Sequence, residues 1–131
     1  DLKEHTSMRK IMDKLITRKT GKPVNRVEYA NTYYKELDDT EKALEILENM
    51  RTQYLQMEGM VKTRPFSKNS VSEKDWGRWQ KAFPEVVSSL VFIYRASDRM
   101  TEAELVLSDW VDRNPTDKNA KKILDNIRSG E

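Results

Sequence analysis

The chain has 131 residues and a net charge of only +2, and its 35% charged and 8% aromatic residues are typical of one small helical domain. Four glycines and four prolines are too few for the many turns of an all-β fold. The absence of cysteine excludes disulfide scaffolds and thiolate metal sites, and the single histidine argues against a zinc site.

The charges are unevenly distributed along the chain. Residues 1–26 and 62–82 are basic on balance, whereas residues 27–61 and 83–131 are acidic. Such blocks can neutralise one another within the fold. They can also give the protein a basic face that attracts nucleic acid or anionic lipid, so both interpretations stay open at this point.

The first predicted element is an amphipathic helix over residues 6–19. Its apolar positions recur at helical spacing, at Met8, Ile11, Met12, Leu15 and Ile16. Its opposite face is basic, with Arg9, Lys10, Lys14 and Arg18. Gly21 and Pro23 end the helix. We expect the apolar face to pack against the next helices, with a membrane-surface or partner-binding helix as the alternative.

Two later stretches, residues 25–55 and 83–115, share the layout of a helical hairpin, in which two amphipathic helices flank a polar turn. Asn25 followed by Glu28 forms a capping box that opens the first hairpin. Asp38 and Asp98 are the predicted N-caps of the second helix in each hairpin. Matching residues lie 60 positions apart, as in Tyr34 and Tyr94, Asp38 and Asp98, Ala43 and Ala103, and Leu47 and Leu107. The sequence therefore predicts a repeated hairpin.

Both hairpins resemble the tetratricopeptide (TPR) repeat, a 34-residue helix–turn–helix unit that stacks into solenoids. The residues at the family's signature positions in the first copy are Val27, Ala30, Tyr34, Asp38, Ala43, Leu47, Met50 and Leu55. In the second copy they are Val87, Leu90, Tyr94, Asp98, Ala103, Leu107, Trp110 and Pro115. Asp replaces the usual turn glycine in both copies. The resemblance implies an all-α fold of antiparallel hairpins, stacked as a short right-handed superhelix.

The resemblance also implies where a partner would bind, because the first helix of each TPR hairpin lines the concave face of the solenoid. The corresponding groove residues are Glu28, Thr32, Lys35, Ser88, Phe92 and Arg95. Family members that grip C-terminal carboxylates use lysine and asparagine where this chain has Glu28 with Thr32 and Ser88 with Phe92. We therefore expect a helix or an extended internal segment of a partner protein rather than a chain terminus.

Residues 56–82 are a predicted insertion, since tandem TPR units would be 34 rather than 60 residues apart. Ser72 is positioned to cap a short helix over residues 73–81. The insertion carries a basic–aromatic patch, made up of Lys62, Arg64, Phe66, Lys68, Trp76, Arg78, Trp79 and Lys81. Such a patch could bind single-stranded nucleic acid or stack on sugar rings. The alternative, which we favour, is that the two tryptophans fill the gap between the hairpins.

The last predicted element is a helix over residues 116–129. Thr116 is its predicted N-cap, and its apolar stripe consists of Ala120, Ile123, Leu124 and Ile127. This pattern is typical of the capping helix at the end of a solenoid, whose outer face is polar. We expect Trp110 to be buried where this helix meets the second hairpin.

Residues 1–131 are therefore expected to form a single TPR-like domain without a catalytic site, metal site or cofactor. The sequence has no nucleotide-binding glycine motif, and its acidic residues 36–41 lack the ligand spacing of a calcium loop. The leading hypothesis is a protein-interaction or scaffold domain that binds a protein partner in the groove of its hairpins. No apolar run is long enough to span a membrane.

Two alternative functions remain. The first is binding of nucleic acid or an anionic surface through the basic N-terminal segment and residues 62–81. The second is a role as the soluble appendage of a larger enzyme, including a membrane enzyme, to which the start at Asp1 gives slight support.

Overall fold

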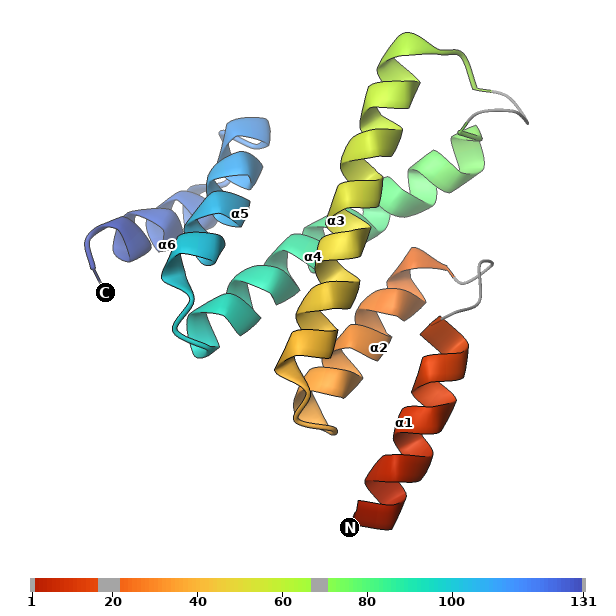
Figure 1. Cartoon of the computed structure of the whole chain (residues 1–131). Coiled ribbons are helices and arrows are strands. Elements are labelled where there is room, and N and C mark those ends of the chain that lie inside the picture. The colour runs from red at the N-terminus through yellow and green to blue at the C-terminus, as the bar shows by residue number, and fades with distance from the viewer. Residues whose placement is uncertain (1, 17–21, 67–70, 131) are drawn as a thin grey trace. The chain divides into compact units, whose positions relative to one another are not determined.

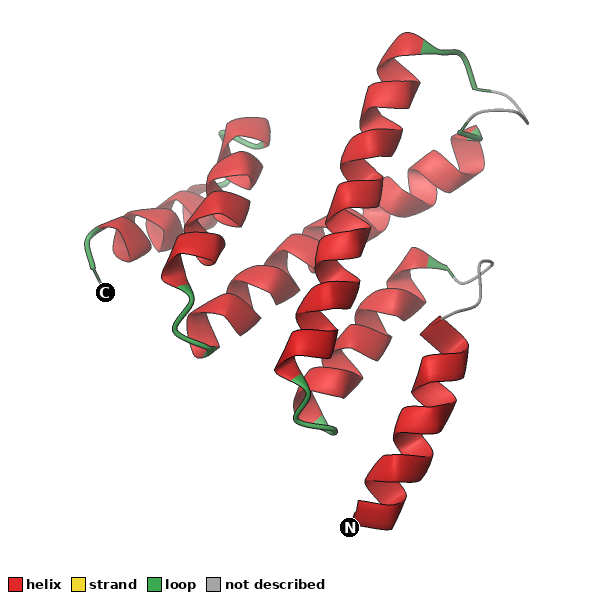
Figure 2. Cartoon of the chain, in the orientation of Figure 1, coloured by secondary structure: helices red, strands yellow, loops and turns green. Residues whose placement is uncertain are grey.

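The computed structural model describes residues 2–16, 22–66 and 71–130, and every regular element within these ranges is a helix (Figure 2). Helices take up 83% of the described residues, so the prediction of an all-α chain is confirmed. In chain order they are α1 (Leu2–Ile16), α2 (Pro23–Lys35), α3 (Thr40–Thr63), α4 (Glu73–Ala96), α5 (Met100–Arg113) and α6 (Lys118–Arg128) (Figure 1). None of these helices combines the length and the apolarity that crossing a membrane requires.

The chain divides into two compact units, Asp1–Val86 and Val87–Glu131, and α4 runs from the first into the second. In the first unit, α1 packs on α2, and α2 packs on α3 as an antiparallel hairpin (Figure 1). In the second unit, α5 packs on α6. The predicted first helix, first hairpin and last helix correspond in sequence to α1, α2–α3 and α6, and the residues of the predicted second hairpin lie in α4 and α5.

The α2–α3 hairpin has a core of side chains at helical spacing. Its fully buried members include Ala30 and Tyr33 of α2, and Ala43 and Leu47 of α3. The alanines allow the two backbones to approach, and the larger residues fill the space around them. Each large apolar side chain buried in this way contributes about 1.5–3 kcal/mol, which is what holds two otherwise marginal helices together.

Asp38 and Asp98 are not the N-caps that the sequence predicted. Both adopt left-handed backbone conformations, with φ of 52° and 58°, immediately after the first helix of each hairpin. At Asp98 the turn is a Schellman motif, in which the N–H of Arg99 donates to the carbonyl of Tyr94 at 2.7 Å. Aspartate tolerates positive φ better than most residues do, which explains why it can stand where the TPR pattern has glycine.

The N-cap of the second helix in each hairpin lies one residue beyond the predicted N-cap. Asp39 is the N-cap of α3, and its carboxylate accepts from the backbone N–H of Lys42 at 3.1 Å. Arg99 occupies the equivalent position before α5 and makes no side-chain cap. The predictions missed this shift because the turn residue and the cap residue are adjacent acidic positions in the first hairpin.

Two further helix starts also differ from the predictions. Pro23 is the first residue of α2, so Asn25 lies inside that helix and not at its N-cap. Proline suits this position because its fixed φ is helical and its missing N–H would have had no intrahelical partner. Asp117 rather than Thr116 caps α6, because its carboxylate accepts from the N–H of Ala120 at 3.0 Å.

The predicted insertion, residues 56–82, mostly extends two long helices. Its first part completes α3 up to Thr63, and its last part is the start of α4. Ser72 accepts a hydrogen bond from the N–H of Asp75 at 3.1 Å, as the capping prediction required. The short helix predicted over residues 73–81 is wrong in extent, since it continues through Pro84 to Ala96. Pro84 lies inside α4 and, lacking an N–H, donates no backbone hydrogen bond there.

Candidate functional site

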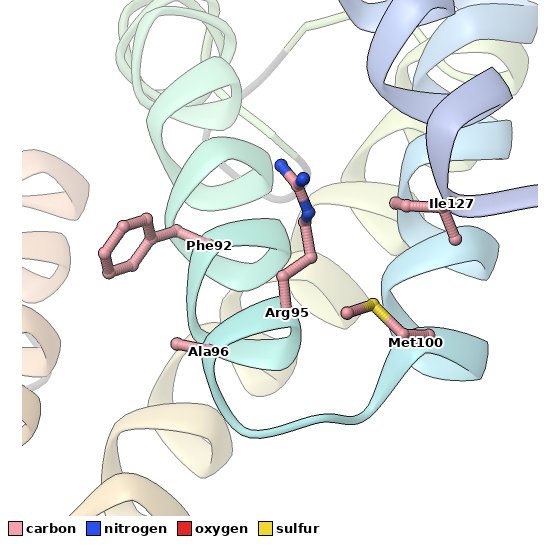
Figure 3. Close-up of a pocket in the computed structure, with 5 residues that line it drawn as sticks. All are labelled: Phe92, Arg95, Ala96, Met100 and Ile127. Carbon is pink, nitrogen blue, oxygen red and sulfur yellow. The ribbon is translucent and has the colours of Figure 1, made fainter. Parts of the chain in front are cut away.

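The second unit contains a cleft of about 420 Å³, lined by Phe92, Arg95 and Ala96 of α4, Met100 of α5 and Ile127 of α6 (Figure 3). The α4 residues are three and four positions apart and so share one face of the helix. In Figure 3 the Arg95 side chain extends between Met100 and Ile127 on one side and Phe92 and Ala96 on the other. The cleft is therefore an apolar surface with one guanidinium at its centre.

Phe92 is the most unusual residue of this cleft, because 61% of it is exposed. Its neighbours Val91 and Ile93 are buried, so the helix turns an aromatic ring outward while its other face meets the core. The ring points away from Met100 and Ile127 (Figure 3). Large exposed apolar side chains beside an apolar cleft are typical of interaction surfaces.

The six predicted groove residues fall in both units. Phe92 and Arg95 line the cleft of the second unit, whereas Ser88 is exposed on α4 and does not line it. The other three residues are in α2 of the first unit, at positions that share one helix face: Glu28, Thr32 and Lys35. Glu28 and Lys35 are exposed, and the Thr32 hydroxyl donates to the Glu28 carbonyl at 2.9 Å. The sequence prediction did not include Met100, and it assigned Ile127 to the apolar stripe of the last helix.

Part of the basic–aromatic patch has a structural role. Trp76 stacks on Tyr54 with ring centroids 5.1 Å apart and planes at 19°. Tyr54 in turn stacks on Phe83 at 3.8 Å and 10°. This aromatic stack, made of Trp76, Tyr54 and Phe83, joins α3 to the first part of α4. Trp79 is half-buried, and Phe66 is 43% exposed near the end of α3.

The cations of the basic–aromatic patch do not share one surface feature. Lys62 pairs with Glu58 on α3 at 3.9 Å. Arg78 and Lys81 instead line a small cleft of about 190 Å³. The remaining lining residues of this cleft are Lys22, Pro23, Val24, Ala82 and Glu85. Lys68 lies outside the described residues.

A network of polar side chains that the sequence did not predict fastens α1 to the α2–α3 hairpin. Arg9 of α1 forms an ion pair with Asp39 and lies 5.9 Å above the centre of the Tyr33 ring. The Tyr33 hydroxyl donates to Asp13 of α1. The hydrogen bond from Arg9 holds the pKa of Asp39 below its ordinary value, and burial raises the pKa of Tyr33.

The structure describes only two side chains of the apolar stripe that was predicted for α1. Of its predicted apolar stripe, Met8 is half-buried and Ile11 is 60% exposed. The side chains of Met12, Leu15 and Ile16 lie outside the described residues, as do residues 17–19 of the predicted helix. The network explains how a helix with a basic face docks on an acidic turn.

Trp110 is half-buried rather than fully buried, which corrects the prediction that it belongs to the core. Its indole N–H donates to the Asp117 carboxylate at 3.0 Å, between α5 and the start of α6. This hydrogen bond lowers the pKa of Asp117. A tryptophan needs a partner for its N–H, and the α6 cap supplies one at the edge of the unit.

Within the described ranges, no three histidine or acidic side chains gather closely enough to hold a metal ion. The chain matches no protein-family model. Searches against curated proteins and against solved structures found no significant match either.

Proposed function

We propose that this protein is a non-catalytic interaction domain built from TPR-like hairpins, and that its second unit binds an acidic, amphipathic segment of a partner protein. The repeat part of the proposal is supported by the equal spacing of matching residues in α2–α3 and in α4–α5. Asp38 and Asp98 lie 60 positions apart and share the same rare backbone conformation. Two copies of one hairpin pattern are what a short TPR-like superhelix requires.

The exposed ring of Phe92 beside the apolar cleft carries the binding proposal. Aromatic and arginine side chains contribute most of the binding energy at protein interfaces, and here they are three residues apart on one helix face. The cleft lies on α4, which is the first helix of its hairpin. The TPR resemblance assigns partner binding to that same helix.

The chemistry of the cleft defines the partner segment. Met100 and Ile127 offer apolar contacts to an inserted side chain, and Arg95 is the only charged residue among the described residues of the lining. A carboxylate on the partner can accept two parallel N–H hydrogen bonds from the guanidinium, which is the strongest form of such a contact. We therefore expect a helix or strand with one large apolar residue and an Asp or Glu a few residues from it.

Selection from a displayed peptide library against the full chain tests this proposal. We expect enriched peptides that combine an apolar anchor with an acidic residue. Phe92→Ala should weaken their binding by about 10- to 100-fold, in the range of an interface hot spot. Arg95→Glu should weaken it similarly by placing a like charge opposite the partner carboxylate.

Leu105→Ala is the matched control for the selection, because Leu105 is 65% exposed in the same unit but does not line the cleft. It should leave affinity unchanged. Peptides that bind Phe92→Ala and Arg95→Glu as tightly as the native chain, or lose as much affinity in Leu105→Ala, would contradict the assignment of this cleft.

A further inference from the structure

We propose that the first unit contains a binding site for a small phosphomonoester, formed by the cleft of about 190 Å³ that Lys22, Arg78 and Lys81 line. The site is in a different unit from the partner-binding cleft, so the two proposals stand or fall separately. Lys22 immediately precedes α2, whereas Arg78 and Lys81 are one turn apart on α4. Residues far apart in sequence therefore place three cations around one hollow.

The charge of this cleft favours an anion. Of the described residues that line it, three are cationic and one, Glu85, is acidic. Arg78 also pairs with Asp75 at 3.6 Å, but both side chains are largely exposed and such a pair is weak. A dianionic phosphate offers each cation a charged acceptor, which a neutral ligand or a single carboxylate does not.

The shape of the cleft favours a small ligand. Pro23, Val24 and Ala82 provide an apolar wall beside the cations. A volume of about 190 Å³ is below the range of sites for drug-sized molecules, and it suits a phosphate with a short carbon skeleton. An extended nucleic acid would need a track of cations and stacking surfaces, whereas Trp76 has one ring face against Tyr54.

Titration of the full chain with O-phospho-L-serine, followed by amide chemical shifts in NMR, tests the site. We expect saturable shifts at Val24 and Ala82, with a dissociation constant on the order of 0.1–1 mM at low salt. L-serine, which lacks the phosphate, should cause none. Arg78→Gln and Lys81→Gln should each weaken binding by about three- to tenfold, because each removes a charge-assisted contact.

Two further variants separate a specific site from general attraction to a basic protein. Lys62→Gln removes the same charge as Lys81→Gln but lies outside the cleft, so it should leave binding unchanged. Glu85→Gln should strengthen binding about two- to threefold, because it removes the one like charge in the lining.

Three results would overturn the proposal. The first is a titration that shows no saturation below about 10 mM. The second is an equal loss of affinity in Lys62→Gln and Lys81→Gln. The third is tighter binding of single-stranded oligouridine than of phosphoserine, with the loss spread over Lys62 as well as Lys81. That last result would identify a nucleic-acid surface in place of a phosphomonoester site.

Discussion

Replacement of Tyr54 by alanine should destabilise the first unit more than any single exposed change. Tyr54 is only 8% exposed and lies between the rings of Trp76 and Phe83. An aromatic ring of this size buries about 150 Å², which at about 25 cal/mol per Å² is about 4 kcal/mol. Its two stacked pairs add about 0.5–1.5 kcal/mol each. Tyr54→Ala should therefore lower the free energy of unfolding by about 5–7 kcal/mol.

Urea unfolding followed by far-UV circular dichroism measures this loss, and the emission of Trp76 should shift to longer wavelength. Since a loss of that size can unfold a small domain outright, Tyr54→Leu serves as a second variant. It keeps an apolar side chain but removes both stacked pairs, so it should cost about 1–3 kcal/mol. Phe66→Ala, at a ring that is 43% exposed, should cost less than about 1 kcal/mol. A cost below about 1 kcal/mol for Tyr54→Ala would refute the role assigned to the aromatic stack.

Three more predictions follow from individual contacts. The Arg9 hydrogen bond lowers the pKa of Asp39 from 3.8, so its stabilising effect is full above about pH 4 and disappears as the pH falls through the lowered value. Asp39→Asn, which can still cap α3, should accordingly be less stable than the native chain at pH 7 in urea titrations, and this difference should shrink as the pH falls through the lowered pKa of Asp39. Asp98→Gly should raise the free energy of unfolding by about 0.5–1 kcal/mol, because glycine adopts positive φ without strain. Asp98→Val should lower the free energy of unfolding, because valine is strained at positive φ. A valine variant as stable as the native chain would contradict the left-handed conformation of this residue. Trp110→Phe removes the N–H that Asp117 accepts, so NMR titration should show the pKa of Asp117 rise toward 3.8, and no change would mean that this hydrogen bond is absent in solution.

The helices and the buried stripes could be predicted from sequence because they depend on local periodicity. The predicted apolar positions that are buried include Val27, Ala30, Leu47 and Ala103. Helix ends were less predictable, since adjacent residues with similar capping ability compete for the N-cap. At Asp38 the deciding factor was backbone conformation, which the side chain alone does not reveal.

Contacts between segments that are distant in the sequence could not be predicted from periodicity. Arg9 and Asp39 are 30 residues apart, and nothing local to either predicts that they meet. The stacking of Tyr54 on Phe83 is also non-local. Of the proposed partner cleft, the sequence indicated Phe92 and Arg95 through the TPR resemblance, whereas Ile127 required the α6 helix to be placed in three dimensions.

A crystal structure of the full chain bound to a selected peptide tests the central claim most directly. We predict that the peptide lies across α4 with an apolar side chain in the cleft. We also expect a peptide carboxylate within hydrogen-bonding distance of the Arg95 guanidinium, and a Phe92 ring that is buried on binding. A peptide bound at any other surface, with Phe92 still exposed and Arg95 without contact to it, would contradict the proposed function.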